Sequence, residues 1–319
     1  MKTEVMEILR LLYNLTKELV PEHTATGLKQ RMWMLGGALK RFPQIRKWYS
    51  ISDNPWLTLA RGRFPIMHGS IYVPYIHRHW PLAQRLATID QHYRMLQGPA
   101  TIIARAILEE VELSRFDEEY AGLRLILDKS EKFNSEGEVV LNLFVGKQRF
   151  YSMAFTLGMD GGQPLILLGA LQGSNVEGAK TIYRDMTYAL HGLFPRDLLM
   201  IALKLLSRQF GIHRIWAISN ANRYRFSQKF KADYDTMWQA HHGQLLDNGF
   251  FEIPTEVRYR QMEEITSRKR KLYRQRYQML DRVAADIAAA CANTSINIAS
   301  QERCSEERAI THGSLFPAD

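Results

Sequence analysis

Residues 164–175 read PLILLGALQGSN, an apolar run that ends in a polar glycine turn. Two helix-like segments follow, KTIYRDMTYAL at 180–190 and DLLMIALKLLSRQFG at 197–211, and the elbow HGLFP lies between them. The block closes with HRIWAISNANRY at 213–224, a second apolar run with a polar end. The pattern predicts a strand, a turn, two helices and a strand. Polar side chains beside such an apolar scaffold are typical of binding and active sites.

Four short apolar or alternating runs, separated by glycines, lead up to this block and include its first strand. They are 123–128, 139–145, 150–158 and 165–171. Their period predicts an antiparallel meander of about four strands. Residues 250–254 predict a last strand beyond the block.

Helical periodicity dominates the chain before the sheet. Four segments carry it: 3–20, 26–41, 81–97 and 99–109. Residues 43–80 hold four prolines and many aromatic residues, which predicts an irregular, packed connector. Residues 258–291 predict one long helix, basic in its first half and rich in alanine at its end.

The fold class predicted from these elements is α+β, with an antiparallel meander sheet flanked by helices. We expect a helical N-terminal region over 1–110 and an α+β domain with the long basic helix over 111–292. A tail without periodicity, 293–319, is expected to be disordered. The order meander, helix, strand is similar to that of N-acyltransferase-like folds, as an analogy of fold alone.

The composition is that of a globular protein, with 46% hydrophobic and 24% charged residues among 319. Cys291 and Cys304 are too few for a disulfide scaffold and lack zinc-ligand spacing. Charges interrupt the amphipathic N-terminal segment, so we expect no secretory signal. No apolar run reaches the roughly 18 residues of a transmembrane helix. These features predict a cytoplasmic protein that can lie against the inner membrane.

The net charge of +9 is concentrated in residues 258–276. This stretch has eight Lys or Arg and two Glu, and 8 − 2 gives +6 of the +9. Such an excess favours an anionic partner, a lipid surface or an acidic protein. The alternative is a solvated helix face. The candidate contacts are four consecutive cations: Arg268, Lys269, Arg270 and Lys271.

Tyrosines are interleaved with these cations. Tyr273 and Tyr277 lie four residues apart, a spacing that suits stacking beside phosphate contacts. Nucleic acid is nevertheless the least supported partner, because the chain contains no recognised nucleic-acid-binding module.

The glycine turn offers candidate ligand contacts at Gln172, Gly173 and Ser174. Ser174 or Asn175 can cap the helix that follows. Alternatively, the free N–H groups of the turn can hold a phosphate, which an N-acyltransferase-like enzyme would need for acyl-CoA. Capping is the favoured interpretation, because a single glycine turn is a weak signal.

Arg184, Tyr188 and His191 are candidate catalytic residues, because their spacing places them on one helical face. His191 can act as a general base or complete the helix end, where Gly192 is suited to the left-handed conformation. The structural role of His191 is the favoured one. Asn220, in the polar end of the block, is a further candidate ligand contact or a turn residue.

Two other histidine clusters occur, His77 with His79 and His241 with His242. Neither group has carboxylates or cysteines at ligand spacing, so packed or surface histidines are favoured and no metal site is predicted. The chain lacks HExxH, GxSxG and Walker A sequences, which disfavours proteases, esterases and nucleotide hydrolases. No cofactor is predicted, and acyl-CoA enters only with the acyltransferase alternative.

A family resemblance is carried by five segments. They are RLATIDQHYRML at 85–96, GALQG at 169–173, IYRDMTYALHGLFPRDLLMIAL at 182–203, IWAISN at 215–220 and SRKRKLYRQRYQMLD at 267–281. In these segments the chain resembles the VirK/YbjX family of enterobacterial virulence-associated proteins, over roughly residues 30–285. The resemblance implies a role in resistance to cationic antimicrobial peptides or in surface placement of an outer-membrane virulence protein. It implies no set of catalytic residues.

Three functions follow as hypotheses. The first is an accessory factor of a Gram-negative enteric bacterium that supports the outer envelope and docks an anionic partner through the basic helix. The second is an acyltransferase-like enzyme that uses the glycine turn for its donor, with His191 or Tyr188 assisting proton transfer. The third is nucleic-acid binding through residues 258–276. The sequence leaves open whether the protein is an enzyme.

Overall fold

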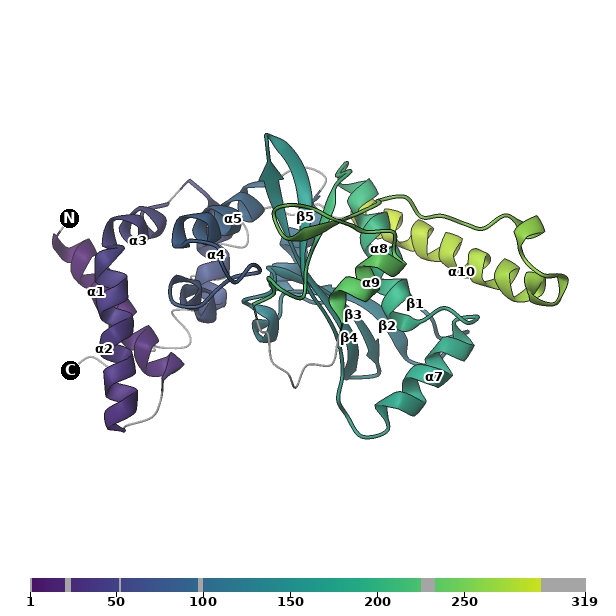
Figure 1. The fold of residues 1–319 in the computed structure, drawn as a ribbon, viewed down its shortest axis with the longest axis horizontal. Coiled ribbons are helices and arrows are strands. Elements are labelled where there is room, and N and C mark those ends of the chain that lie inside the picture. Colours follow the sequence, from purple (N-terminus) through teal and green to yellow (C-terminus); the bar gives the residue numbers. More distant parts are fainter. Residues whose placement is uncertain (1, 21–23, 52, 97–99, 225–232, 294–319) are drawn as a thin grey trace.

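One open, eight-stranded sheet forms the centre of the molecule, with the order β1-β2-β3-β4-β5-β6-β8-β7 (Figure 1). The computed structural model describes residues 2–20, 24–51, 53–96, 100–224 and 233–293. The strands are β1 Val111–Arg115, β2 Leu123–Asp128, β3 Val139–Val145, β4 Gln148–Asp160, β5 Gln163–Gly173, β6 Ile215–Ile218, β7 Gln244–Leu245 and β8 Phe250–Ile253. Neighbouring strands are antiparallel except β5 and β6, which are parallel. The α+β prediction is confirmed.

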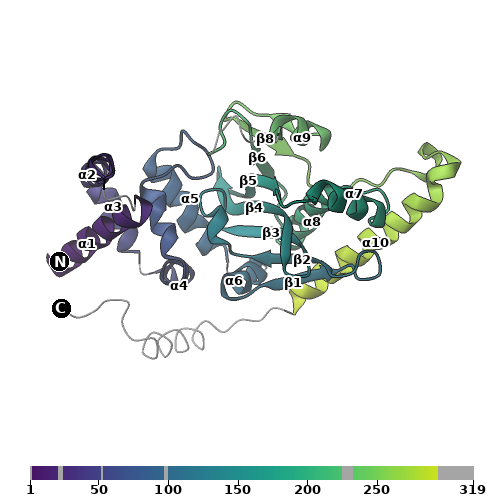
Figure 2. The ribbon, with the colours of Figure 1, turned by 90° about the horizontal axis from the view of Figure 1, so that it is seen from below.

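Helices cover the sheet from two sides. Helices α1 to α5 lie on one side, and α7, α8 and α10 lie on the other (Figures 1 and 2). The N-terminal helices are α1 Lys2–Leu19, α2 Ala25–Lys40, α3 Phe42–Tyr49, α4 Pro55–Arg63, η1 Pro65–Ile71, α5 Leu82–Arg94 and α6 Thr101–Leu108. The later ones are η3 Glu131–Phe133, α7 Ala179–Ala189, α8 Pro195–Gln209, α9 Tyr234–Ala240, η4 Met262–Glu264 and α10 Ser267–Ala292.

The central strands are buried on both faces. Helix α5 packs on β4, and α8 packs on β3 and β4. For this reason VVLNLFV in β3 reads as an apolar run without polar alternation. Long α10 closes one end of this layer by packing on β1 and α8.

The strand, two helices and strand predicted over residues 164–224 form a crossover connection. It leaves β5, passes through α7 and α8, and returns as β6 parallel to β5. The two strands pair only from Ile166 to Leu168, and β5 continues to Gly173 paired with β4 but not with β6. A bulge lies at the point of separation, where Gly169 has no partner in β4. A side chain there would overlap the carbonyl oxygen of Glu136, which explains the glycine.

A buried polar network joins the N-terminal helices to the sheet. Glu138 accepts from the Lys129 ammonium at 2.7 Å and from the Tyr93 hydroxyl at 2.6 Å. Burial alone would raise the pKa of Glu138, but Lys129 and its other neighbours outweigh burial and lower it. Alongside, His92 of α5 accepts from the Leu157 N–H of β4 through Nδ1 at 3.0 Å. We call Lys129, Glu138, Tyr93 and His92 the junction network.

Several sequence predictions need correction. The connector over 43–80 is largely helical, because α3, α4 and η1 occupy it and three of its four prolines, Pro43, Pro55 and Pro65, stand at helix starts. The sheet has strands that were not predicted, β1 and β7, and α9 was also missed. The basic helix begins at Ser267 rather than 258, because residues 254–261 are extended. The tail predicted to be disordered lies, from residue 294 onward, outside the described residues.

Candidate functional site

The elbow between α7 and α8 ends the first helix with a double capping bond. The N–H of His191 donates to the Tyr188 carbonyl, and the N–H of Gly192 donates to the Thr187 carbonyl. This is the Schellman arrangement, in which the left-handed residue is usually glycine. Here His191 itself takes that conformation, with φ 54°, and Gly192 follows with φ 76°. The prediction for Gly192 is confirmed, and His191 proves to share the left-handed turn.

The elbow is also where the basic helix meets the crossover block. Arg276 of α10 donates from Nε and Nη2 to the His191 carbonyl, at 3.0 and 2.7 Å. The same guanidinium lies 4.3 Å from the centroid of the Tyr273 ring. The His191 backbone therefore has a firm structural role, whereas its side chain makes no hydrogen bond or ion pair within the described part of the chain.

The other two candidate catalytic residues are exposed on α7. Tyr188 is 87% exposed, and the Arg184 guanidinium pairs, within the described chain, only with the neighbouring Asp185 at 3.3 Å. Among the described residues, no carboxylate forms a hydrogen bond or ion pair with the His191 ring that would orient it as a base. Catalytic roles for these three residues stay predictions.

The glycine turn does not cap α7 as predicted. The helix begins at Ala179, and its N-cap is Gly178 with φ 76° and no side-chain bond. Ser174 instead accepts from the Val176 N–H at 3.4 Å within the turn. The capping prediction for Ser174 and Asn175 is wrong, because the turn continues for several residues beyond them before the helix starts.

The candidate contacts therefore do not share one cavity. Gln172 donates to Glu136 at 3.0 Å and faces a cavity on the N-terminal side of the sheet. Asn220 is used structurally: its side chain donates to Asp233 at 2.7 Å and accepts from the Tyr234 N–H at 3.0 Å. Asn220 thus fixes the start of α9. Gly173 packs against the Tyr183 hydroxyl and the Tyr151 ring, which leaves little room for a side chain.

An aromatic groove runs along α7 and the elbow toward α10. Its volume is about 660 Å³, and its surface is mostly apolar. We define this elbow groove by five large side chains, Tyr151, Tyr183, Tyr188, Phe194 and Leu272. Three cations edge it: Lys180, Arg184 and Arg196. An apolar floor with a cationic rim suits an amphipathic anion.

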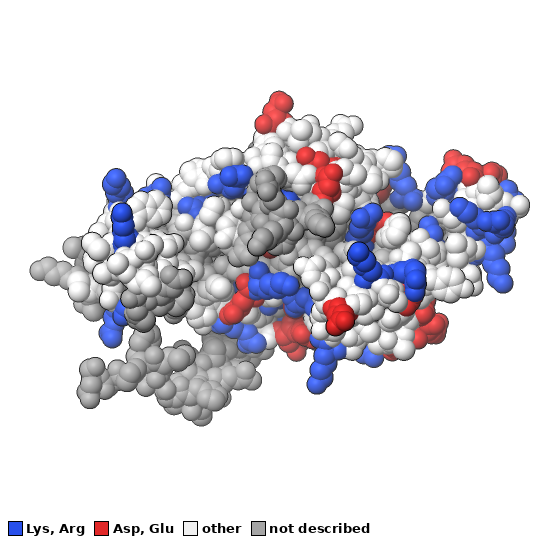
Figure 3. Space-filling view, turned by 60° about the horizontal axis from the view of Figure 1, so that its bottom comes forward, with Lys and Arg blue, Asp and Glu red and all other residues white. Residues whose placement is uncertain are grey.

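The candidate cations of α10 lie beside this groove, at the end of the helix that projects from the body (Figure 3). Arg268, Lys269 and Lys271 are exposed, as is Arg274. Within the described residues none of the four has an ion pair or a side-chain hydrogen bond. Arg270 differs, because it is half-buried and donates to the Ile265 carbonyl at 3.0 Å. Three of the four predicted contacts are thus available to a partner, and Arg274 joins them.

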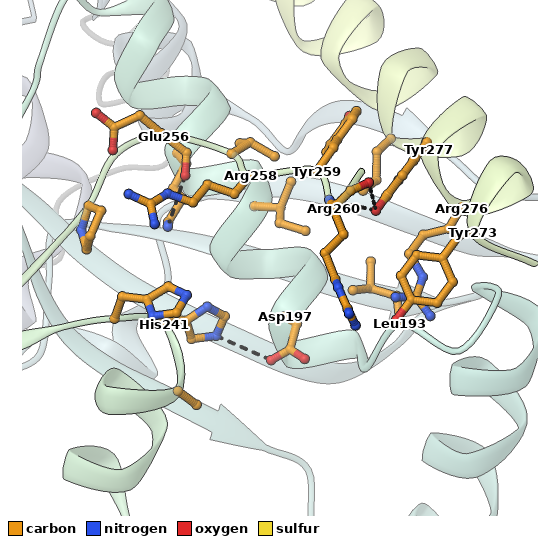
Figure 4. Close-up of a pocket in the computed structure, with 17 residues that line it drawn as sticks. Leu193, Asp197, His241, Glu256, Arg258, Tyr259, Arg260, Tyr273, Arg276 and Tyr277 are labelled. Carbon is orange, nitrogen blue, oxygen red and sulfur yellow. Dashed lines mark hydrogen bonds and ion pairs between the residues drawn. The ribbon is translucent and has the colours of Figure 1, made fainter. Parts of the chain in front are cut away.

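A second cavity, of about 250 Å³, lies on the other side of the elbow between α8 and α10 (Figure 4). Asp197 and Lys204 of α8 line it, together with Arg258 and Arg260 of the extended segment before η4. His241 enters from the end of α9, and its Nε2 lies 3.3 Å from Asp197 Oδ1. We call this the α8–α10 cavity.

The His241–Asp197 pair was missed from the sequence. His241 had no carboxylate at ligand spacing, and its partner lies in another helix, so local spacing could not find it. The other histidine group behaves as expected for packed residues: His77 is 8% exposed and stacks on Trp80 at 5.8 Å between ring centroids.

Among the described residues, no three His, Cys, Asp or Glu side chains are grouped to hold a metal ion. In the same part of the chain, no helix has both the length and the apolar character to cross a bilayer.

Together these features define an α+β protein with one open sheet, a helical crossover and a cationic, aromatic end. Residues 27–289 match the family model described as "Protein of unknown function (DUF535)". The match covers most of the chain, and the protein belongs to this family.

Curated relatives agree with that assignment. The chain is 27% identical to the "Uncharacterized protein YbjX" of Escherichia coli (strain K12) over 253 residues, 75% of this chain and 76% of the relative. It is 26% identical over 268 residues to an uncharacterized protein of Haemophilus influenzae, covering 83% of this chain and 87% of the relative. The resemblance to the VirK/YbjX family is confirmed.

Proposed function

We propose that this protein is a peripheral accessory factor that docks on an anionic lipid surface through the projecting half of α10. In the cell, it would act from the cytoplasmic face of a Gram-negative enteric bacterium. There it would support outer-envelope integrity, resistance to cationic antimicrobial peptides, or surface placement of an outer-membrane virulence protein. The family resemblance supports this setting.

One observation carries the docking proposal. Arg268, Lys269, Lys271 and Arg274 project together, exposed and without acidic partners among the described residues. Each Lys or Arg near an anionic membrane contributes about 1 kcal/mol of binding. Four of them are therefore worth about 4 kcal/mol, which is roughly a thousandfold in affinity.

The tyrosines of α10 favour lipid over nucleic acid. Tyr277 stacks on Tyr259 at 4.4 Å between centroids, with the rings 3° from parallel. Tyr273 is covered by the guanidinium of Arg276. Because these ring faces are already occupied, they offer little stacking to bases. Two exposed aromatic side chains of the elbow groove, Tyr188 and Phe194, can instead enter a lipid interface.

The test is co-sedimentation of the full chain with vesicles of phosphatidylglycerol and phosphatidylcholine, and with phosphatidylcholine alone. Arg268, Lys269, Lys271 and Arg274 are replaced together by Gln. We expect wild type to bind the anionic vesicles, less so at high salt, and the variant to lose binding by about a thousandfold.

A matched control removes four exposed lysines elsewhere: Lys29, Lys40, Lys47 and Lys147, each replaced by Gln. It loses the same net charge, so it separates a local docking surface from the charge of the whole protein. Equal loss in both variants, or none in the α10 variant, would refute docking through α10.

An acyltransferase-like enzyme is the second candidate. The observation that favours it is the parallel pair β5 and β6, which separate beyond Leu168 beside the bulge at Gly169. Beyond this separation, the Leu171 N–H donates to the Tyr234 hydroxyl at 3.1 Å, so the strand edge that β6 leaves unpaired is already partly satisfied. This candidate predicts that acyl-CoA raises the melting temperature and that His191→Ala folds but loses turnover. No thermal shift with acyl-CoA of several chain lengths would count against it.

A further inference from the structure

We infer that the α8–α10 cavity is a binding site for a small phosphate monoester, held by Lys204, Arg258 and Arg260. This site is separate from the lipid-docking cations of α10 and goes beyond the proposed docking function. Figure 4 shows the labelled side chains of Asp197, His241, Arg258 and Arg260 around this cavity, which they reach from three different segments.

Lys204 is the first reason. It is 7% exposed, and its ammonium donates to the Glu256 carbonyl at 3.3 Å. It forms no ion pair within the described chain. Burial lowers the pKa of Lys204, Glu256 raises it, and Arg258 lowers it further. A buried ammonium without a paired carboxylate is costly unless a counter-charge is bound nearby.

The arginines of the extended segment provide the second reason. Arg258 is exposed and makes no side-chain hydrogen bond or ion pair among the described residues. Arg260 has only exposed contacts with Glu264, one to its carbonyl at 3.1 Å and one to its carboxylate at 3.9 Å. Guanidinium groups bind phosphate through paired N–H donors, and Arg260 can turn toward a ligand by giving up only its solvent-exposed contacts with Glu264.

The charges around the cavity do not balance. Its lining has four cations, Lys204, Arg258, Arg260 and Arg276, and two carboxylates, Asp197 and Glu256, and 4 − 2 leaves +2. A phosphate monoester carries about −1.5 to −2 at pH 7. The Asp197 carboxylate is engaged by His241 at 3.3 Å, so it is partly satisfied before an anion arrives.

The size and walls limit the ligand. About 250 Å³ is slightly below the roughly 300–1,000 Å³ of ordinary ligand pockets, so a phosphate with a few carbon atoms fits better than a whole lipid. The stacked rings of Tyr259 and Tyr277 form an apolar wall for the organic part. Tyr259 is fixed by a hydrogen bond from its hydroxyl to Asp281 at 2.9 Å, which keeps this wall in place.

The test is isothermal titration of the full chain with glycerol 3-phosphate, inorganic phosphate and glycerol at low salt. We expect glycerol 3-phosphate to bind most tightly, inorganic phosphate more weakly, and glycerol not at all. Equal binding of the two phosphates would refute a monoester site and indicate a free-phosphate site. No binding of either would refute the inference entirely.

Two variants locate the site. Lys204→Met removes the buried charge at similar length, and Arg258→Gln removes an exposed charge with little risk to folding. Each should weaken glycerol 3-phosphate binding about tenfold or more, since hydrogen bonds to charged groups are the strong ones. Unchanged affinity in the folded Arg258→Gln variant contradicts the assignment, whatever becomes of Lys204→Met.

The fourfold Gln variant of α10 serves as the control. It should bind glycerol 3-phosphate as wild type does, while Arg258→Gln should still co-sediment with anionic vesicles. Loss of phosphate binding in the α10 variant would place the site on the docking helix and overturn its location in the cavity. The two proposals can therefore fail independently.

Discussion

The junction network and the α10 end of the molecule both gather charged and aromatic side chains, but they differ in how those charges are paired. In the junction network Lys129 and Glu138 are buried and bonded to each other, and Tyr93 completes the carboxylate's hydrogen bonds. At the α10 end, Arg268, Lys269 and Lys271 have no acidic partner in the described chain. The first set of charges is completed by the fold. The cations of the α10 end remain available to a partner molecule, so the α10 end is the better place to look for function.

The largest effect is expected in the junction network. Lys129→Ala leaves the buried Glu138 carboxylate without its cation, which costs about 3–5 kcal/mol. Urea unfolding followed by circular dichroism measures the change. The control is Arg115→Ala, whose exposed pair with Glu112 at 2.8 Å should cost less than about 1 kcal/mol. If both variants lose similar stability, the network is not what holds the helices to the sheet.

The second-largest loss of stability is expected where α10 contacts the elbow of the crossover connection. Arg276→Ala removes two hydrogen bonds to the His191 carbonyl and the contact with Tyr273. We expect a loss of about 1.5–3 kcal/mol, the range for hydrogen bonds to a charged group. Arg274→Ala, two residues away and without such bonds, should change the unfolding free energy by less than about 0.5 kcal/mol. Equal effects would show that α10 is held by its apolar contacts alone.

The junction network should also make the stability of the protein depend on pH, through His92. Burial, opposed by Glu138 and assisted by Lys129, lowers the pKa of His92 from 6.5 to about 3. The folded protein therefore keeps His92 neutral while the unfolded chain takes up a proton below pH 6.5. Its contribution to stability is complete above pH 6.5 and is lost as the pH falls toward 3, by about 1.4 kcal/mol per pH unit.

The measurement compares unfolding free energies of wild type and His92→Gln between pH 7 and 4.5. The variant starts less stable, because the Leu157 N–H loses the ring nitrogen that accepts it. Its unfolding free energy should then fall less steeply on acidification. The difference in slope from wild type should be about 1.4 kcal/mol per pH unit, which corresponds to one proton. Parallel curves would mean that His92 titrates alike in the folded and unfolded chains.

The elements of the fold were predictable where local pattern decides them. The meander, the two crossover helices and the basic helix follow from period and composition. Strands β1 and β7 were missed because VELSR and the two residues of β7 are short and take their structure from neighbouring strands. The α3 and α4 segments were missed because their prolines, read as breakers, stand at the starts of helices.

The candidate site was predictable only in part. The cations of α10 and the elbow at His191 are local features, and the structure brings them together through Arg276. The elbow groove combines side chains from β4, α7, the elbow and α10, so no spacing in the sequence reports it. The same holds for His241 and Asp197, whose contact depends on how α9 and α8 pack.

The smallest change in stability is expected at Tyr188. This residue also gives the sharpest test of whether the α10 end, unlike the junction network, serves binding rather than stability. Its side chain is 87% exposed, so Tyr188→Ala should change the unfolding free energy by less than about 0.5 kcal/mol. Binding to anionic vesicles should nevertheless fall several-fold, because an aromatic side chain of the elbow groove is removed from the lipid interface. Trp33→Ala, 78% exposed on α2, is the matched control and should bind as wild type. If Tyr188→Ala also binds vesicles normally, docking depends on the α10 cations alone. If Tyr188→Ala instead abolishes turnover with acyl-CoA, Tyr188 belongs to a catalytic site. The α10 end of the molecule then takes part in catalysis rather than in docking.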